Sequence, residues 1–392
     1  MKIGIVWENG VSKWMSQMFE PLMELPGVDM NVFVGERNKF DVRDVRLRKH
    51  DLTHREEILL GIYNAVTFSG RAPRSPYRKM HFYLNSLDKY LQGYDIVECH
   101  DSSRSLYTLS ELKRRKGFKL VVSYAENIPY RQVFDDKTNH IKKSAYEMVD
   151  HFIPWCDTIK DVLLLEGVPP EKVTRVYTGV DLSLFRPEPP DSSLRDGLGI
   201  RPGEFIILYI GKLTSWKGVH MLAYVARALE AKGYGDFRIV VAGRGAQLEN
   251  LKKLIAEAGV NERFRFAGFI PYDKIGRLYN IADVFVMPSY PTMTWQEQFG
   301  MVLVEAMACA RCVIGSATGS IPEVIGDAGM TFTPGNFFEL AGRIASLMDD
   351  RGLVREFGER GRRRAETLFD ARKNAAEIYG VYKNALEGTK AK

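Results

Sequence analysis

Two acidic residues, Glu297 and Glu305, stand eight positions apart at the start of a strongly apolar segment. Eight residues span a little over two helical turns, so the two carboxylates lie on nearby faces at different depths. Helix N-terminal amides favour anions, so those of Phe299, Gly300 and Met301 predict a pyrophosphate site. Flanking carboxylates suit hydroxyl groups, and together these features indicate a nucleotide-sugar site. The alternative is that the acids only stabilise the first helical turn.

Glycines and cations follow two of the expected strands. A glycine lets a ligand approach the backbone closely, and an ammonium offers a point charge to a diphosphate. The residues are Gly211, Lys212 and Lys217 after strand 205–210, and Gly243 and Arg244 after strand 237–242. A solvated pair of loop lysines is the alternative for the first group, and a lone Gly-x-Gly is a weak signal for the second.

Short apolar runs alternate with segments of helical period, which predicts parallel α/β domains. A chain of 392 residues is long enough for two of them. The Pro- and Ser-rich stretch from 187 predicts a linker, so the expected domains are 1–186 and 187–370, with a helix at 371–392 crossing back to the N-terminal domain. Doubly wound domains bind ligands at the carboxyl ends of their strands, and we expect the two edges to face each other across a ligand cleft.

The positions of the expected strands complete this prediction. In the first half they are 2–7, 29–34, 94–98, 119–124, 150–153 and 173–177. In the second half they are 205–210, 237–242, 263–267, 283–287, 312–314 and 329–332. The stretch 36–80 is irregular and basic, and it is too long for a simple connection.

The motifs of the second half resemble the nucleotide-sugar signature of retaining glycosyltransferases of family 4, which have the GT-B fold. The matching strings are Pro288-Ser289, Glu297-Gln-Phe-Gly, Glu305-Ala-Met-Ala and Gly211-Lys212…Lys217-Gly218, with Lys212 where relatives often carry Arg. The resemblance is specific across 150–385. It implies two Rossmann-like domains, of which 1–186 binds the acceptor and 187–370 binds the nucleotide sugar. It also implies Glu297 at the donor sugar and Glu305 at the ribose hydroxyls.

Three positions of the first half are candidate site residues, and two of them depart from the family pattern. Gly10 stands alone where many relatives have a Gly-Gly phosphate loop, and it is a candidate donor contact. His100 ends an expected strand as in relatives and is a candidate catalytic residue; a structural hydrogen bond is the alternative. Depending on register, Ala125 or Glu126 takes the place of a donor-contacting His, and we favour Glu126 as a contact of the sugar or the acceptor.

The resemblance implies transfer of a hexosyl or related unit, with retention, from a UDP- or GDP-sugar to a hydroxyl acceptor in cell-surface polysaccharide or glycolipid synthesis. Lys212, Lys217 and the amides near Gly300 would stabilise the leaving diphosphate. No Asp-x-Asp motif is present, so neither a metal nor a cofactor is expected. The alternatives are an NAD-dependent oxidoreductase, disfavoured by the missing N-terminal Gly-x-Gly-x-x-Gly, and a catalytically silent GT-B scaffold.

Charge and composition bear on partners and location. A net charge of +6 permits anionic partners without demanding nucleic acid, and none is expected. No apolar run approaches about 20 residues and no signal peptide is visible, so the cytoplasm is the expected location. Two basic clusters could contact an anionic membrane surface or a phosphorylated acceptor: Arg71, Arg74, Arg78 and Lys79, and Lys113, Arg114, Arg115, Lys116 and Lys119. The alternatives are solvated surface for the first cluster and the cap of a helix C-terminus before Gly117 for the second. The partners expected overall are a nucleotide-sugar donor and a sugar or lipid-linked acceptor. The pair Cys309 and Cys312 is expected to lie in the core.

Overall fold

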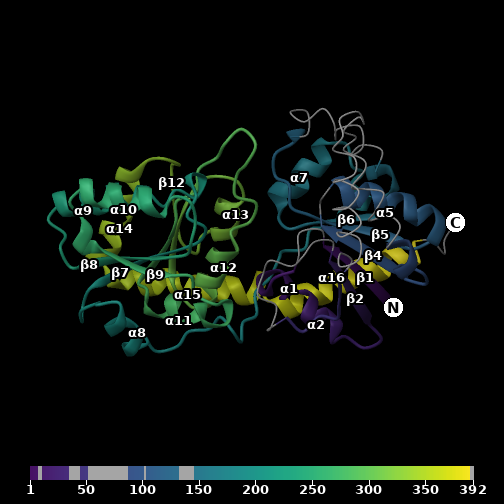
Figure 1. Cartoon of the computed structure of the whole chain (residues 1–392), viewed down its shortest axis with the longest axis horizontal. Helices are drawn as coiled ribbons and strands as arrows, with labels where there is room; N and C mark the ends of the chain where they lie inside the picture. The colour runs from purple at the N-terminus through teal and green to yellow at the C-terminus, as the bar shows by residue number, and fades with distance from the viewer. Residues whose placement is uncertain (8–10, 35–44, 52–86, 101–102, 132–144, 389–392) are drawn as a thin grey trace, which may run out of the picture. The chain divides into compact units, whose positions relative to one another are not determined.

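The computed structural model describes residues 1–7, 11–34, 45–51, 87–100, 103–131 and 145–388 (Figure 1). The chain divides into an N-terminal unit, Met1–Tyr177 with Arg372–Lys392, and a C-terminal unit, Thr178–Ala371. The first boundary falls nine residues before the linker expected at 187, because the intervening segment packs in the C-terminal unit. Val180 pairs with Asp370, and the Phe185 ring lies edge-on to Tyr279.

The N-terminal unit contains a six-stranded parallel sheet in the order β3-β2-β1-β4-β5-β6. The strands are β1 (Lys2–Trp7), β2 (Asp29–Val34), β3 (Lys49–Asp51), β4 (Ile96–His100), β5 (Lys119–Tyr124) and β6 (His151–Pro154). The chain builds outward from β1 to β3 and then returns to place β4 against the other side of β1. The direction of winding therefore reverses between β1 and β4, which is where ligands bind in sheets of this kind.

Helices cover both faces of this sheet (Figure 1). They are α1 (Lys13–Ser16), α2 (Phe19–Met23), α5 (Ser103–Lys116), α7 (Asp157–Leu165) and α16 (Ala371–Glu387). Buried residues of α2 and α16, including Phe19, Ile378 and Tyr382, share one core with β1 and β2. The helix α5 ends in a basic run before Gly117, whose φ of 78° is the left-handed value typical of a helix end.

The structure differs from the strand predictions for this half in two places. Residues 173–177 form only an isolated bridge, in which Val173 pairs with Phe152 of β6. The short strand β3 was missed because its sequence, Lys-His-Asp, has none of the apolar character that indicates a buried strand.

The C-terminal unit repeats the same winding with the strand order β12-β11-β10-β7-β8-β9. The strands are β7 (Phe205–Ile210), β8 (Phe237–Ala242), β9 (Phe264–Gly268), β10 (Val284–Met287), β11 (Cys312–Ser316) and β12 (Met330–Phe332). Each lies within two residues of its predicted position. The strands β7, β8 and β10 are buried along their whole length because helices cover both faces of the sheet. Here the winding reverses between β7 and β10.

The helices of this unit form two layers. Figure 1 shows α9 (Met221–Ala231), α10 (Leu248–Glu257) and α14 (Phe337–Asp349) on one face of the sheet. The other face carries α11 (Ile275–Ile281), α12 (Met301–Ala308) and α15 (Arg351–Leu368). The remaining helices are α8 (Ser192–Gly197) and α13 (Ile321–Ile325). None of the described helices is both long and apolar enough to cross a bilayer. The two doubly wound α/β domains expected from the sequence are therefore present.

Candidate functional site

An ion pair lies at the reversal of winding in the C-terminal unit. Lys217 follows β7 and Glu297 follows β10, the two strands between which the winding reverses. Lys217 Nζ is 2.7 Å from Glu297 Oε2, and Ser289 Oγ donates to the same oxygen at 3.0 Å. The lysine side chain is 22% exposed and that of the glutamate 9%. A cation and a carboxylate thus share a half-buried position where this fold binds ligands.

The loops after β7 and β10 fit against each other through a glycine. Gly218 has φ of 70°, and a Cβ built on it would lie 1.8 Å from the carbonyl oxygen of Pro288. Beside this contact the Tyr290 amide donates to the Trp216 carbonyl at 2.7 Å. The Trp295 ring lies with its centroid 5.0 Å from Lys217 Nζ. Lys217 therefore supplies a charge, and Gly218 permits the backbone turn that positions this charge.

The loops after β7 and β8 are also in direct contact. A Cβ on Gly243 would lie 1.9 Å from the carbonyl oxygen of Gly211, so the two loops approach closely only with glycine at position 243. Lys212 is exposed and forms no ion pair with any residue that the structure describes. Arg244 is exposed as well, and its guanidinium lies 4.6 Å from the centre of the Phe269 ring. Two cations are thus accessible beside the Lys217–Glu297 pair along the same sheet edge.

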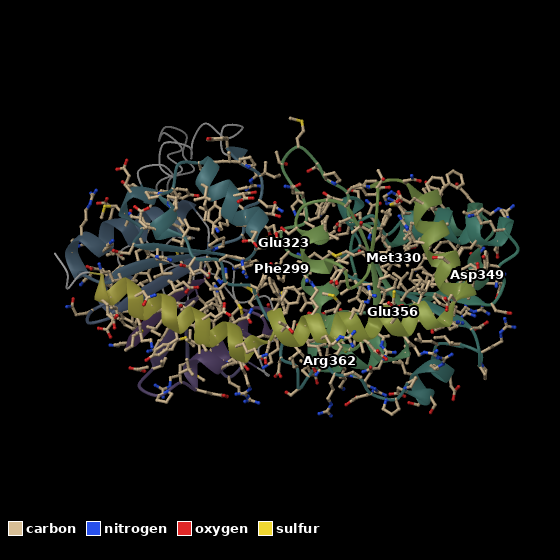
Figure 2. All side chains as sticks on the ribbon, turned by 180° about the vertical axis from the view of Figure 1, so that it is seen from behind. Phe299, Glu323, Met330, Asp349, Glu356 and Arg362 are labelled. Carbon is tan, nitrogen blue, oxygen red and sulfur yellow. The ribbon has the colours of Figure 1, made fainter. Side chains whose placement is uncertain are left out.

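The helix α12 begins where the sequence predicts. Gly300 precedes it with φ of 92°, and within the described structure the amides of Gly300 and Met301 have no hydrogen-bond partner. Phe299 is 2% exposed and its ring packs edge-on against Phe369. Figure 2 shows Phe299 and Glu323 at one end of the unit and Asp349 at the other. The buried Phe299 anchors the turn. The amides of Gly300 and Met301 can therefore donate hydrogen bonds to an anion.

Glu305 has two partners that the spacing did not predict. The carboxyl is 1% exposed and accepts hydrogen bonds from Tyr272 Oη at 2.6 Å and Tyr279 Oη at 2.7 Å. Burial raises the pKa of Glu305 above its ordinary value. Each oxygen already accepts one hydroxyl, so a ligand hydroxyl would share it. These tyrosines lie 26 and 33 residues before Glu305, and only the fold brings them to it.

His100 lies in a different setting from the one expected. It ends β4 among aromatic rings, and burial lowers its pKa to about 3. The imidazole is therefore neutral near pH 7, and its catalytic role stays a prediction. Glu126 is 7% exposed, and its carboxylate lies 2.6 Å from Arg131 Nε. Gly10 falls outside the described residues.

The remaining predicted features are structural where they are described. All five cations of the second basic cluster pair with acids: Lys113 and Lys119 with Asp150, Arg114 with Glu111, and Arg115 and Lys116 with Asp88. The first cluster, Arg71-Arg74-Arg78-Lys79, lies outside the described residues. Cys309 and Cys312 are free and buried, and burial raises the pKa of each thiol to about 12. The expected core role of this pair is confirmed.

Comparisons with known proteins match both halves of the chain. Residues 27–184 match the model described as Glycosyltransferase Family 4, and residues 191–364 match that of Glycosyl transferases group 1. D-inositol 3-phosphate glycosyltransferase of Streptomyces bingchenggensis is 34% identical over 232 residues, 57% of this chain and 50% of that protein. The aligned part thus spans about half the length of that relative.

Solved structures resemble the whole chain. Sucrose-phosphate synthase of Thermosynechococcus elongatus matches with a TM-score of 0.77 and 20% identity over 99% of this chain and 100% of the other. HepE of Anabaena, solved in complex with UDP, matches with a TM-score of 0.79 and 19% identity over 98% of this chain and 100% of the other. HepE has also been solved with UDP-glucose. At this level of identity the likeness establishes the fold.

Proposed function

This chain belongs to family 4 of the glycosyltransferases and has the GT-B fold, and on that premise we propose that it transfers a hexosyl unit from a nucleoside-diphosphate sugar to a hydroxyl acceptor, with retention of configuration. The observation that carries the proposal is the Lys217–Glu297 ion pair at the reversal of winding between β7 and β10. UDP is the proposed carrier, supported by the UDP complexes of HepE.

The ion pair gives the donor site a way to respond to its ligand. A diphosphate competes with Glu297 for the Lys217 ammonium, because both offer negative oxygens to one cation. When the ammonium turns toward the diphosphate, its contact with the buried Glu297 carboxylate weakens, and further hydrogen-bond donors to that carboxylate become favourable. The hydroxyls of the donor sugar supply them. Binding of the diphosphate to Lys217 and binding of the sugar hydroxyls to Glu297 are therefore coupled.

Charge stabilisation drives the proposed reaction. Negative charge builds on the diphosphate as the glycosidic bond breaks, and positive groups fixed in advance lower the barrier. We assign this role to Lys217, to the exposed Lys212 and to the amides of Gly300 and Met301. We assign Glu305 to the ribose hydroxyls, which it would bind together with its two tyrosines. These lysines supply the positive charge, so we propose that catalysis needs no metal.

A pair of matched lysine variants tests the donor site. Lys217→Ala should lower kcat/KM about a hundredfold or more, because it removes a preorganised charge. Lys252→Ala is the control: it also breaks a lysine–glutamate pair, with Glu249 at 2.9 Å, but on the exposed face of α10. Equal activity of the two variants would exclude Lys217 from the mechanism.

The stereochemical outcome and the metal requirement are tested together. With an α-linked UDP-sugar and EDTA present, the product should form at an undiminished rate and show the small anomeric proton coupling of an α linkage. A β-linked product would contradict retention, and loss of activity in EDTA that Mg²⁺ restores would contradict metal independence.

Contact with a membrane is a separate proposal. Because all five cations of the second basic cluster pair with acids, it now rests on Arg71, Arg74, Arg78 and Lys79. Anionic lipid attracts basic residues near its surface by about 1 kcal/mol each. We propose that these four residues bring the protein to the inner face of the membrane. Flotation with anionic vesicles should retain the wild type and release a variant with all four replaced by Gln.

A further inference from the structure

The segment between β10 and α12 brings a tryptophan to the ammonium of Lys217. Trp295 is partly buried, and the ammonium lies over its ring with Nζ 5.0 Å from the centroid. A cation within about 6 Å of an aromatic centre is attracted to the electron-rich face of the ring, and tryptophan is the best such partner. Among the described residues, Lys217 therefore has two partners, the Glu297 carboxylate and the Trp295 ring.

Tyr290 fixes the first end of this segment. Its amide donates a hydrogen bond to the Trp216 carbonyl at 2.7 Å, and its ring stacks on that of His220 with 5.4 Å between centroids. The two edges of the ring face two glycines. A Cβ on Gly218 would lie 3.1 Å from Tyr290 Cε2, and one on Gly335 would lie 3.3 Å from Cε1. The close packing of Tyr290 holds the start of the segment against the loop that carries Lys217.

A small turn fixes the backbone of Trp295 at the second end. The Thr292 amide donates to the Trp295 carbonyl at 2.7 Å, and the Thr292 hydroxyl donates to the same oxygen at 3.2 Å. The Trp216 ring lies beside that of Trp295, with 6.3 Å between their centroids. Met293, inside the turn, is 76% exposed and contributes little to the packing. The segment is therefore fixed at both ends, and its second end carries the ring that contacts Lys217.

The ring and the carboxylate hold the ammonium in different ways. Glu297 competes with a diphosphate for Lys217, because both offer negative oxygens to one cation. The Trp295 side chain has no net charge and no acceptor atom, since its indole N–H can only donate. A diphosphate can therefore bind Lys217 Nζ without displacing the ammonium from the ring. The contact with Trp295 is the one that Lys217 can keep in both states.

We propose that Trp295 is a positioning residue: its ring holds the Lys217 ammonium at the sheet edge while the hydrogen bonds of the ammonium shift from Glu297 toward the diphosphate. This role rests on the proposed function, because that function assigns Lys217 to a diphosphate. Lysine has a flexible four-carbon stem. A contact that persists in both states reduces the conformational freedom that this stem loses when the diphosphate binds. Trp295 touches no reacting atom in this role and acts only through Lys217.

A double-mutant cycle tests whether Trp295 acts through Lys217. Trp295→Leu keeps an apolar side chain and removes the ring, so UDP should bind about tenfold more weakly in titration calorimetry. In a Lys217→Ala background the cation is already absent, and Trp295→Leu should weaken UDP binding no further. Equal losses in the two backgrounds would overturn the proposal, because Trp295 would then act independently of Lys217.

Rescue by another ring separates this role from simple packing. Trp295→Phe keeps an aromatic face, so it should bind UDP within about threefold of the wild type. The control is Tyr379→Leu, which removes a ring whose centre lies 4.9 Å from Lys383 Nζ on α16, and which should leave UDP affinity unchanged. The proposal fails if Trp295→Phe binds UDP as weakly as Trp295→Leu, or if Tyr379→Leu loses as much.

NMR of ¹³C-lysine-labelled protein observes the contact without a donor. The Lys217 signals are assigned by their loss in Lys217→Arg. The ring current of Trp295 should move the Hε protons of Lys217 upfield in the wild type, and Trp295→Leu should return them to the position of an exposed lysine. The upfield shift should persist when UDP is added. Its absence in the free protein, or its loss on binding UDP, would overturn the proposal.

The two measurements separate failure of this inference from failure of the proposed function. If UDP does not bind the wild type while the Lys217 signals show the ring-current shift, the proposed donor is contradicted and only the contact between Trp295 and Lys217 stands. If UDP binds the wild type and Trp295→Leu equally well, the donor stands and the positioning role of Trp295 is overturned.

Discussion

Replacing Glu297 by Gln should make UDP bind more tightly while glycosyl transfer collapses. In the wild type, UDP without its sugar draws Lys217 partly away from Glu297 and offers the carboxylate no donor-sugar hydroxyl in return. Gln carries no charge, so the free-energy cost of weakening the ion pair when UDP binds disappears in the variant. UDP-glucose should gain less than UDP, because its sugar supplies hydroxyls to the wild-type carboxylate.

The size of the effect follows from the burial of the pair. Exposed ion pairs contribute about 0–1 kcal/mol, whereas breaking a buried pair costs about 3–5 kcal/mol. At 22% and 9% exposure, with 2.7 Å between the charged atoms, the Lys217–Glu297 pair lies between these limits. The ammonium has three donors and keeps part of its contact with Glu297 while it binds phosphate. We therefore expect a net change of about 1.4 kcal/mol, a tenfold gain in UDP affinity.

Titration calorimetry at constant ionic strength measures this change. The control is Glu356→Gln, which removes an acid paired with Arg360 on α15 and changes the net charge by the same amount (Figure 2). Its UDP affinity should match that of the wild type. If Glu297→Gln binds UDP no better than the wild type, or gains no more than Glu356→Gln, Lys217 is not shared between Glu297 and the diphosphate.

Three further predictions concern stability. Glu98 is fully buried and burial raises its pKa from 4.5 to about 7, so the folded state retains a proton that the unfolded state loses, and stability falls as pH rises across that window. Glu98→Gln should abolish this dependence of Tm on pH. Above pH 7 the variant should be more stable than the wild type by up to about 3 kcal/mol. A wild-type Tm that does not change from pH 4.5 to 7 would contradict the raised pKa of Glu98. Ser12→Ala should leave the Tm unchanged or raise it, because within the described residues the Ser12 hydroxyl caps no helix amide and has no hydrogen-bond partner. A loss of about 1 kcal/mol, usual for a helix cap, would show a contact. Gly218→Ala should lower the Tm by several degrees, whereas Gly342→Ala, with open space around its Cβ, should not; equal Tm values would show that the β7 and β10 loops adjust freely.

The sequence predicts the C-terminal unit well for a physical reason. A strand such as β7, Phe-Ile-Ile-Leu-Tyr-Ile, is buried on both sides, so its sequence shows one unbroken apolar run. Strand β3 is polar along its whole length and leaves no such trace. Local apolar character therefore predicts strands in the middle of a sheet better than a short strand at its edge.

The candidate site shows where sequence reasoning stops. The individual residues, Lys217, Glu297 and Glu305, were recognisable from their type and spacing. Their partners were not, because Lys217 meets Glu297 across 80 residues and Tyr279 meets Glu305 across 26. The neutral state of His100 also depends on the rings of Trp7 and Trp155, which only the sheet assembles. Contacts between distant segments require the fold.

The discontinuous N-terminal unit has a consequence for synthesis on the ribosome. Residues 1–177 emerge first, yet their unit is complete only when α16 brings Tyr382 to the buried Glu98. The 194 residues from 178 to 371 are made in between, which takes about 10 to 40 s at 5 to 20 residues per second. During that interval the face of the first sheet that α16 covers stays open to solvent, while the C-terminal unit is a continuous stretch able to fold as it appears. The half of the protein that is made first is therefore the last to become native, and it is the half most in need of protection from aggregation while the chain grows.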